Sequence, residues 1–523
     1  MRMTRVVLAA TVFGYAAPGA VLAQSLPTRS GFVPAGPGMA RSIATDEPDS
    51  VPHTLIETLG IAYETNPQLT AERAHLRSTD ENVPTALAGW RPTVSVSGSY
   101  GYAAGKYIES QSCSSNTQPG CRSFPVKVTQ DGITGTTQSF GSETFPEAIK
   151  NNRYEDQGTA TVTQYLYRGG KTTASTHEAV NSVYAERARL IAEEETVFTD
   201  TVNAYVGVIE DQQLLALDRA NEQVLGDELK AINDRFRVGE LTRTDVAQAE
   251  AALAAAIATR QTAEGTLETA RATFVRQVGV QPPADLIDPQ PLKLPFKDKK
   301  EVVELATSNN PNVIAAKFNE SQLRDAVDVA FANLGPTVSL QGSALYANGA
   351  SLVRQQSYGG SATINVTIPL YQGGSEYAAI RQARQNYLQA VRQTEDAQRA
   401  ARELAVQAYE TLLAARASIE SSKVGVRSSE IALEGLEREA LVGSATTQEV
   451  LIGQQNLLAA QITLVQNITS MVTASYGVAS AIGRLTASDL GLQVPLYDET
   501  AYYRAVKDLL WGSGDRAVNQ PGR

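Results

Sequence analysis

The sequence predicts a mixed α/β membrane protein made of two copies of one structural unit. Matching segments recur at fixed offsets, which indicates an internal duplication. Two segments in each half alternate apolar and small polar residues, the pattern of strands with unlike faces. Each half then holds a proline-free stretch, 171–236 or 375–441, long enough for a helix of about 100 Å.

The N-terminus predicts a cleaved signal peptide over residues 1–23. Arg2 and Arg5 supply the positive start, an apolar run covers 6–17, and small residues precede the cleavage point. A membrane anchor is the alternative, but the apolar run is short and interrupted. We therefore expect export to the periplasm, with residues 24–52 as an N-terminal extension.

Composition excludes two broad classes of protein. The 523 residues carry a formal net charge of -11 and show no Lys/Arg cluster, so nucleic acid is not an expected partner. A hydrophobic content of 42% is too high for a disordered chain. After the signal peptide no run reaches about 18 consecutive apolar residues, so we expect no transmembrane helix and a membrane location only through strands.

The duplication sets the predicted domain boundaries. The segment at 92–95 recurs at 336–339 and the Asn-Pro pair at 66–67 recurs at 310–311, both at an offset of 244 residues. Later segments recur at an offset of 204, so the first copy holds an insertion of 40 residues. We predict a first repeat over 53–281, a proline-rich linker over 282–296, a second repeat over 297–486 and a C-terminal tail over 487–523, without pattern beyond about 498.

Each repeat contains one predicted β-hairpin, over 93–167 and 337–371. In the first strand Val94, Val96 and Tyr100 alternate with small hydroxyl residues. Apolar and tyrosine side chains suit lipid, and small hydroxyls suit a water-filled lumen. Four strands cannot close a barrel, and open edges in lipid would leave backbone groups unpaired. Other copies must complete the ring, and three copies give a trimeric twelve-stranded barrel.

Each hairpin leads into a pair of long helices, predicted over 171–277 and 375–482. Their apolar seams are narrow, so they must pair laterally with neighbouring helices. The pattern predicts three kinds of special position: strand-to-helix turns at Gly169, Gly170, Gly373 and Gly374, turns between the long helices at Val238, Gly239, Val442 and Gly443, and a possible disulfide between Cys113 and Cys121. Two idle thiols remain the alternative to the disulfide.

No residue pattern predicts catalysis or a cofactor. The three histidines, His53, His75 and His177, are not spaced with other ligands as metal sites require, and His75 is expected in a surface or core role. Nucleophile and phosphate-loop motifs are missing from the sequence. We expect a protein that is not an enzyme.

The ordered set of motifs resembles the TolC family of outer-membrane efflux and type I secretion channels. The resemblance rests on the two Asn-Pro pairs, the hairpin exit at 369–374 and the helix turns at 235–246 and 442–451. It implies a homotrimer with a twelve-stranded barrel in the outer membrane, continued by a twelve-helix barrel through the periplasm. It also implies a periplasmic adaptor protein and an inner-membrane pump or ABC exporter as partners.

The resemblance further implies a gate at the periplasmic turns. Glu449 matches an acidic residue that forms a ring at the family's constriction, and Asp245 matches an acid of the family's lock. The other lock positions are Ala440 and Ala445, so the lock is absent or rebuilt, and Arg243 is a candidate partner for Glu449. Helix capping is the alternative role for Asp245 and Glu449.

The leading functional prediction is the exit duct of an efflux or type I secretion system, which passes small molecules or unfolded polypeptides out of the cell. The alternative is a periplasmic helical adaptor or scaffold that never enters lipid. The two hairpins distinguish them, because a soluble adaptor has no need for strands with one apolar and one hydroxyl face.

Overall fold

The computed structural model describes residues 52–110, 123–130, 133–140, 146–293, 298–349 and 356–514. All of them belong to one compact unit, Ser50–Arg523. The predicted signal peptide, nearly all of the extension at 24–52, and the cysteine pair Cys113 and Cys121 lie outside these residues.

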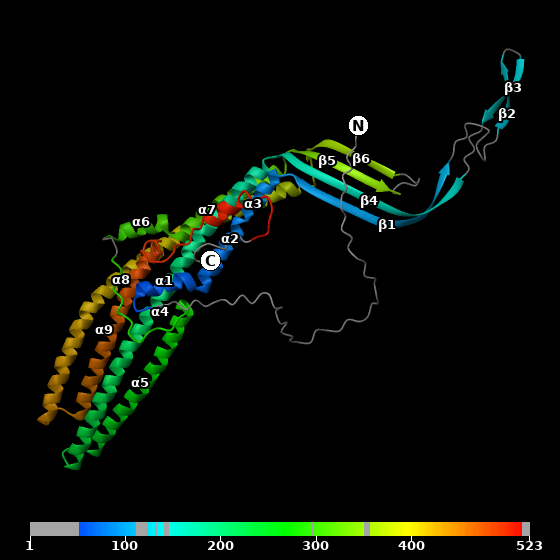
Figure 1. Cartoon of the computed structure of the whole chain (residues 1–523). Helices are drawn as coiled ribbons and strands as arrows, with labels where there is room; N and C mark the ends of the chain where they lie inside the picture. Colours follow the sequence, from blue (N-terminus) through cyan, green and yellow to red (C-terminus); the bar gives the residue numbers. More distant parts are fainter. Residues whose placement is uncertain are drawn as a thin grey trace. The chain divides into compact units, whose positions relative to one another are not determined.

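Four long strands form one antiparallel sheet (Figure 1). Its order is β1 (Thr93–Ser110), β4 (Pro146–Arg168), β5 (Thr337–Asn348) and β6 (Gln356–Thr367), so the two predicted hairpins lie side by side. The pairing of β1 with β4 continues to Ser110 and Pro146, beyond the part of the predicted hairpin in which apolar and small polar residues alternate. The insertion contributes a separate two-stranded ribbon, β2 (Ser123–Gln130) and β3 (Ile133–Phe140), which the sequence did not predict.

The strand register assembles two chemically different faces. Ser95, Thr161, Ser343 and Ser361 are aligned across all four strands, and the adjacent row on that face holds Thr93, Thr163, Gln341 and Thr363. On the other face, Val94 and Val162 share a row with Gly342 and Ala362. Residues directly opposite one another point to the same side of a sheet, so each predicted face is continuous over four strands.

Two pairs of long helices follow the hairpins (Figure 1). α4 (Lys171–Arg237) and α8 (Ser375–Leu441) have 67 residues each, and α5 (Arg243–Val278) and α9 (Thr447–Ala481) return beside them. By length and composition alone α9 meets the criterion for a membrane span, with a window of mean hydropathy 1.3, although polar residues interrupt the run of about 18 apolar residues that the sequence prediction required. Its side chains nevertheless bond to neighbouring helices, since Asn467 donates to Ser422 and Thr469 to Glu210.

Shorter helices extend the two returning helices. α2 (Pro67–Asp80) begins where α5 ends, and α7 (Pro311–Ala332) begins where α9 ends. Asn66 accepts from the first N–H groups of α2 while its amide donates to the Gln277 carbonyl, 3.0 Å away. Asn310 does the same for α7 and donates to the Ala481 carbonyl at 3.2 Å. Both junctions thus have the same geometry. Each joins two helices end to end, because one buried asparagine side chain bonds to the end of the first helix and the start of the second.

The helices therefore stand as four columns in a fixed order. The column of α5 and α2 packs against α4, α4 packs against the column of α9 and α7, and this packs against α8. α3 (Asn82–Leu87) and the 3₁₀ turn η1 (Ala88–Trp90) lead from α2 to β1. α1 (Leu55–Thr65) and α6 (Lys299–Asn309) pack against α4 and α8.

The C-terminal residues pack against the helices, and beyond residue 498, where the sequence predicted no pattern, the structure has the short helix α10. Leu485, Ala487 and Leu492 are buried in the main core with helices α1, α4, α5 and α9, and α10 (Ala501–Val506) packs against α2. The guanidinium carbon of the buried Arg73 lies 5.3 Å from the centre of the Tyr497 ring, which is a cation–π distance. These apolar contacts were missed because they are short and irregular, without helix or strand periodicity.

Buried carboxylates of α4 hold this C-terminal segment. The Glu194 carboxylate accepts from the Ala487 N–H at 2.6 Å, and Glu195 accepts from the Leu485 N–H at 3.3 Å. Burial raises the pKa of Glu194 to about 7 and that of Glu195 to about 8, with the nearby Asp489 adding to both shifts and Arg73 opposing the shift of Glu194. Docking of the segment thus favours protonated carboxyl groups.

We expect docking of residues 485–506 to weaken as pH rises. The docked pKa values of about 7 and about 8 exceed the undocked value of about 4.3. The docked state therefore binds more protons, so its stability is complete below pH about 4 and is lost as pH rises through 7 to 8. Hydrogen exchange of the Leu485 and Ala487 amides, corrected for intrinsic rates, should show faster opening at about pH 9 than at about pH 6.

Glu195→Gln should reduce this pH response, because the neutral amide has no proton to lose. Glu193→Gln, two positions earlier in α4, is the matched control and should keep the wild-type response. If the opening rate of Glu195→Gln rose with pH as steeply as that of the wild type, Glu195 would not be the group whose proton stabilises docking.

A second prediction compares two strand-to-helix turns. Gly169 and Gly373 have similar φ values of +61° and +69°, but an added Cβ at Gly169 would lie 2.6 Å from the Ala332 carbonyl oxygen, and at Gly373 it would meet no heavy atom within 4 Å. Both alanine variants share a left-handed strain of about 1–2 kcal/mol. Gly169→Ala adds an overpacking cost of about 1–3 kcal/mol.

The thermal unfolding midpoint of the purified protein in detergent measures the difference. Gly169→Ala should unfold at a clearly lower temperature than Gly373→Ala. Equal midpoints would mean that α7 moves away from the turn without cost.

Candidate functional site

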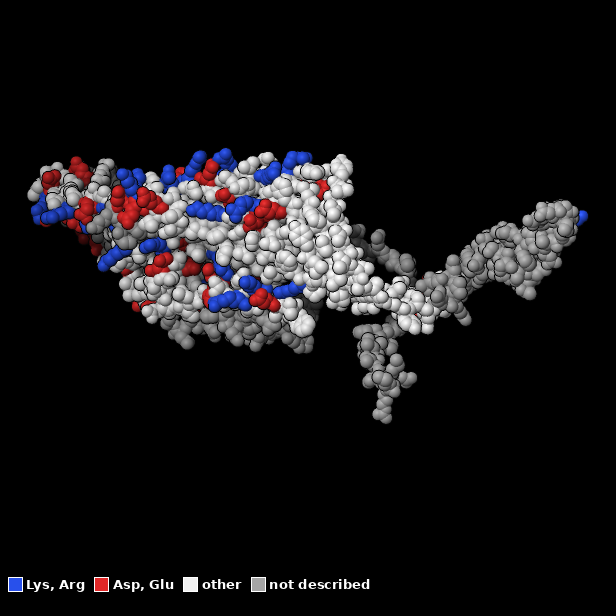
Figure 2. All heavy atoms as spheres, turned by 90° about the horizontal axis from the view of Figure 1, so that it is seen from above, with Lys and Arg blue, Asp and Glu red and all other residues white. Residues whose placement is uncertain are grey.

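The apolar face of the sheet is exposed in the single chain. Val96 is 80% exposed and Ile364 is 67% exposed, although both lie on well-formed strands. β5 and β6 contain no charged residue. On the face seen in Figure 2, charges of both signs are spread over the helical part, whereas the adjoining sheet surface is nearly free of them. A large uncharged apolar surface of this kind marks contact with lipid or with protein.

Aromatic side chains bound the apolar face at both ends. Near the helices, Tyr167 shares a row with Val338 and Val366. Toward the far end Tyr346 pairs with Tyr358, and Tyr154 stacks on Tyr100 with ring centres 5.7 Å apart. From Val338 to Tyr346 the strand rises about 27 Å, or about 20 Å in height if tilted as in a barrel. This approaches the apolar band of about 25 Å, flanked by aromatic girdles, of outer-membrane barrels.

The sheet ends in two open edges. β1 and β6 each pair on one side only, so one side of each strand presents unpaired backbone groups among the residues that the structure describes. Small hydroxyl and amide side chains cover the opposite face, where Ser343 and Ser361 are 2.9 Å apart and Asn365 donates to Gln341. Short polar groups of this kind suit contact with water. The unpaired backbone groups at the two edges are able to pair with further strands.

The first turn between the long helices joins α4 to α5. Gly239 adopts a left-handed φ of +84°. The Glu240 N–H donates to the Arg235 carbonyl at 2.9 Å, and this hydrogen bond ends α4. Such a glycine ends a helix without side-chain strain. Val238 is 73% exposed at this turn, so it is available for contact with another molecule.

The second turn, from α8 to α9, has the same geometry. Gly443 has a φ of +81°, the Ser444 N–H donates to the Glu439 carbonyl at 2.9 Å, and Val442 is 80% exposed. The four predicted turn residues Val238, Gly239, Val442 and Gly443 therefore occupy the tips of the two helix pairs.

Both predicted gate acids take part in capping boxes in the single chain. The Thr446 N–H donates to the Glu449 carboxylate at 2.7 Å, and the Glu449 N–H donates back to the Thr446 hydroxyl at 3.3 Å. Asp245 is joined to Thr242 in the same way, at 2.8 Å and 3.3 Å. This is the capping role that the sequence left open, and the Thr-x-x-acid pattern could have revealed it.

These hydrogen bonds keep the two acids ionised. The Thr446 backbone N–H, followed by its hydroxyl, lowers the pKa of Glu449 below its usual value. The Thr242 hydroxyl and N–H lower the pKa of Asp245, and the Thr447 hydroxyl adds a smaller effect. Thr447 begins α9, so Asp245 lies at the meeting point of α5 and α9. No local sequence pattern indicates this role of Thr447, because its contact joins the two repeats.

The predicted pairing of Arg243 with Glu449 is not made within one chain. Arg243 is exposed at the start of α5, and the ion pairs found among the described residues do not include it. Ala440 and Ala445 flank the second turn with side chains too short for an ionic lock. Pairing between copies stays a prediction.

A histidine that the sequence placed in a surface or core role joins an ionic cluster. His75 on α2 contacts the buried Glu186 on α4, and Arg189 donates to the other Glu186 oxygen at 2.9 Å. Glu72, His75 and Glu186 each offer one atom that could bind a metal ion, and these atoms lie within 4.8 Å of one another. Because the His75 ring contacts one Glu186 oxygen and Arg189 donates to the other, the cluster is explained as a polar network that fixes α2 on α4.

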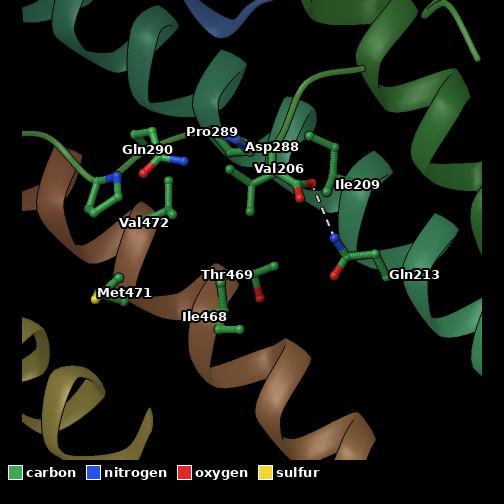
Figure 3. Close-up of a pocket in the computed structure, with 11 residues that line it drawn as sticks. Val206, Ile209, Gln213, Asp288, Pro289, Gln290, Ile468, Thr469, Met471 and Val472 are labelled. Carbon is green, nitrogen blue, oxygen red and sulfur yellow. Dashed lines mark hydrogen bonds between the residues drawn. The ribbon is translucent and has the colours of Figure 1, made fainter. Parts of the chain in front are cut away.

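A cavity of about 240 Å³ lies beneath the predicted linker. Figure 3 shows linker residues 288–290 above α4 and α9, with the Gln213 amide donating to Asp288 at 3.1 Å across the opening. The rest of the lining is mostly apolar, including Val206, Ile209 and Val472. It holds no set of polar groups that would define a substrate.

Comparison with known proteins agrees with this geometry. The family model "Outer membrane efflux protein" matches residues 58–280 and again 302–484. The outer membrane efflux protein BepC of Brucella suis biovar 1 (strain 1330) is 32% identical over 462 residues, which cover 88% of this chain and 91% of BepC. The outer membrane protein TolC of Escherichia coli (strain K12) is 24% identical, covering 57% of this chain and 63% of TolC.

Solved structures share the fold. The Campylobacter jejuni CmeC outer membrane channel superposes with a TM-score of 0.65 at 16% identity, over 83% of this chain and 86% of CmeC. The open state of the Neisseria gonorrhoeae MtrE outer membrane channel gives 0.64 at 16% identity, over 83% and 89%. The family model covers most of the chain, and BepC is matched almost from end to end. The chain therefore belongs to the outer membrane efflux protein family and is an outer-membrane efflux channel.

Proposed function

We propose that three copies of this chain form one conduit, with a shared twelve-stranded barrel in the outer membrane and twelve helical columns below it in the periplasm. The single observation that carries the proposal is the open four-stranded sheet with one apolar and one hydroxyl face. In lipid its two edges must be paired, and pairing β6 of one copy with β1 of the next closes a ring.

The outer column of helices supports the same assembly. α8 stands at one end of the row of columns and exposes large apolar side chains that a neighbouring copy would cover: Tyr377, Leu388, Leu404, Leu413, Val424 and Ile431. The α5 and α2 column stands at the other end. Contact between unlike ends of identical chains gives a closed ring when the rotation is a third of a turn.

We also propose that the two halves arose by internal duplication and that residues 1–23 direct export. The two separate matches of one family model and the paired Asn66 and Asn310 caps support the duplication. The position of the protein in the outer membrane agrees with a signal sequence. In the oxidising environment outside the cell, Cys113 and Cys121 would staple the inserted loop.

The tips of the helix pairs are the proposed gate and docking end. A periplasmic adaptor protein and an inner-membrane pump or ABC exporter would meet the exposed Val238 and Val442 turns. A trimer would place three Glu449 carboxylates near one another. The hydrogen bonds from Thr446 lower the pKa of each Glu449 in the single chain and so oppose the rise in pKa that mutual repulsion would cause. A ring of this charge favours cations in the pore.

The first test is channel formation by the purified protein. We expect a trimer that resists SDS, fractionates with outer membranes and conducts in a planar lipid bilayer. A monomer that washes off membranes with salt and never conducts would instead favour the periplasmic scaffold.

A second test removes the proposed ring charge. Glu449→Gln should lower the cation preference of the pore, measured as the reversal potential in a salt gradient, because glutamine retains the capping box without the charge. Asp245→Asn is the matched control for the capping site and should change selectivity less. Equal effects would assign the change to helix ends instead of to a Glu449 ring.

Arg243→Glu tests the remaining gate prediction. If Arg243 holds Glu449 of a neighbouring copy, charge reversal should raise the conductance of the closed state, because two carboxylates would then repel. Unchanged closed-state conductance would remove Arg243 from the gate.

A further inference from the structure

The only two tryptophans of the sequence, Trp90 and Trp511, lie within two positions of residues that bond to each other. Trp90 ends the 3₁₀ turn that leads into β1. Its neighbour Arg91 donates from Nη1 to the Leu509 carbonyl at 2.7 Å, although the two residues are 418 positions apart. The C-terminal segment therefore lies beside the base of the sheet at Leu509.

The segment is held at this place by specific contacts. Tyr502 donates to Glu81 at 2.8 Å, and the Arg187 guanidinium lies over the Tyr503 ring at 5.4 Å. Val506 is buried. On the other side, the Gln164 side chain of β4 donates to the Trp90 carbonyl at 2.9 Å. Two independent tethers thus bring both tryptophans to the helical end of the sheet.

The side chains at this end are exposed and apolar. Trp511 is 86% exposed, Leu510 72% and Trp90 49%. We call these three residues the base patch. Large apolar side chains held at fixed places without protein cover need another partner. The exit of β6 adds Leu370 and Tyr371, 88% and 78% exposed, at the same end of the sheet.

Lipid headgroups fit this setting. Tryptophan and tyrosine concentrate where the hydrocarbon of a membrane meets water, because their rings are apolar and carry a polar group. The apolar sheet face begins at Val94, four positions after Trp90. Arg91 and the exposed Lys507 and Asp508 lie beside the patch, so charges of both signs surround it, which suits the zwitterionic headgroups of lipids.

We propose that the base patch is a membrane anchor, in which Trp90, Leu510 and Trp511 enter the headgroup region of the leaflet facing the periplasm. The inference rests on the proposed passage of the strands through the outer membrane. It gives the C-terminal segment a role in fixing the height of the channel in the bilayer.

Tryptophan fluorescence tests the anchor directly, since each variant Trp90→Phe or Trp511→Phe leaves a single natural tryptophan. The full-length protein is reconstituted in phosphatidylcholine vesicles whose acyl chains carry bromine, a contact quencher, either near the headgroup or near the chain end. Both variants should lose most of their emission with shallow bromine and much less with deep bromine, relative to vesicles without bromine.

A third protein separates this inference from the proposed function. Val96→Trp in a background of Trp90→Phe and Trp511→Phe places a single tryptophan on the apolar strand face, and deep bromine should quench it. Ser95→Trp in the same background faces the lumen and should stay unquenched by bromine at either depth.

The outcomes are distinct. Quenching at position 96 without quenching of Trp511 overturns the anchor and leaves the proposed barrel intact. If Trp511 is then quenched by aqueous iodide, it faces water, and if neither quencher acts, a neighbouring copy covers it. No quenching at position 96 overturns the barrel itself.

Discussion

The structure depends on backbone hydrogen bonding at the edges of one small sheet. Four strands with an uncharged apolar face cannot remain alone in lipid, because every free N–H and C=O at β1 and β6 would lose its water partners. In the proposed trimer, ring closure by identical copies satisfies these groups and places the hydroxyl rows of Ser95 and Thr93 around a polar lumen. The helices would share this symmetry, since all four strands connect to helical segments at one end of the sheet.

The junctions between helices show how a short polar side chain extends a structure over a great length. Asn66 and Asn310 each receive one helix end and begin the next, so two helices act as one column. The adjoining proline gives up no hydrogen bond at the first position of a helix. The uninterrupted helices α4 and α8 pack beside these junctions and run from the sheet to the tips.

Much of this fold could be predicted from the sequence, because its elements have strong periods. α8 begins and ends at the predicted residues, and the two strand faces follow from simple alternation. The β2–β3 ribbon and the docked C-terminal segment were missed, since their stabilising contacts join distant parts of the chain. The Arg91–Leu509 bond is an example that no local pattern could reveal. At the tips, the sequence left open whether Asp245 and Glu449 cap helices, and the structure shows that both do so, with Thr242 and Thr446 as their partners.

The docked C-terminal segment has a consequence for biogenesis. Leu485, Ala487 and Leu492 complete a core whose other walls come largely from the first half of the chain. If the chain is exported from its N-terminus as proposed, the apolar surface of the first half stays open until residues 485–492 arrive. A chain truncated before Leu485 would keep this surface exposed to periplasmic chaperones and proteases. Closure of the core thus links the stability of a subunit to synthesis of its C-terminal segment.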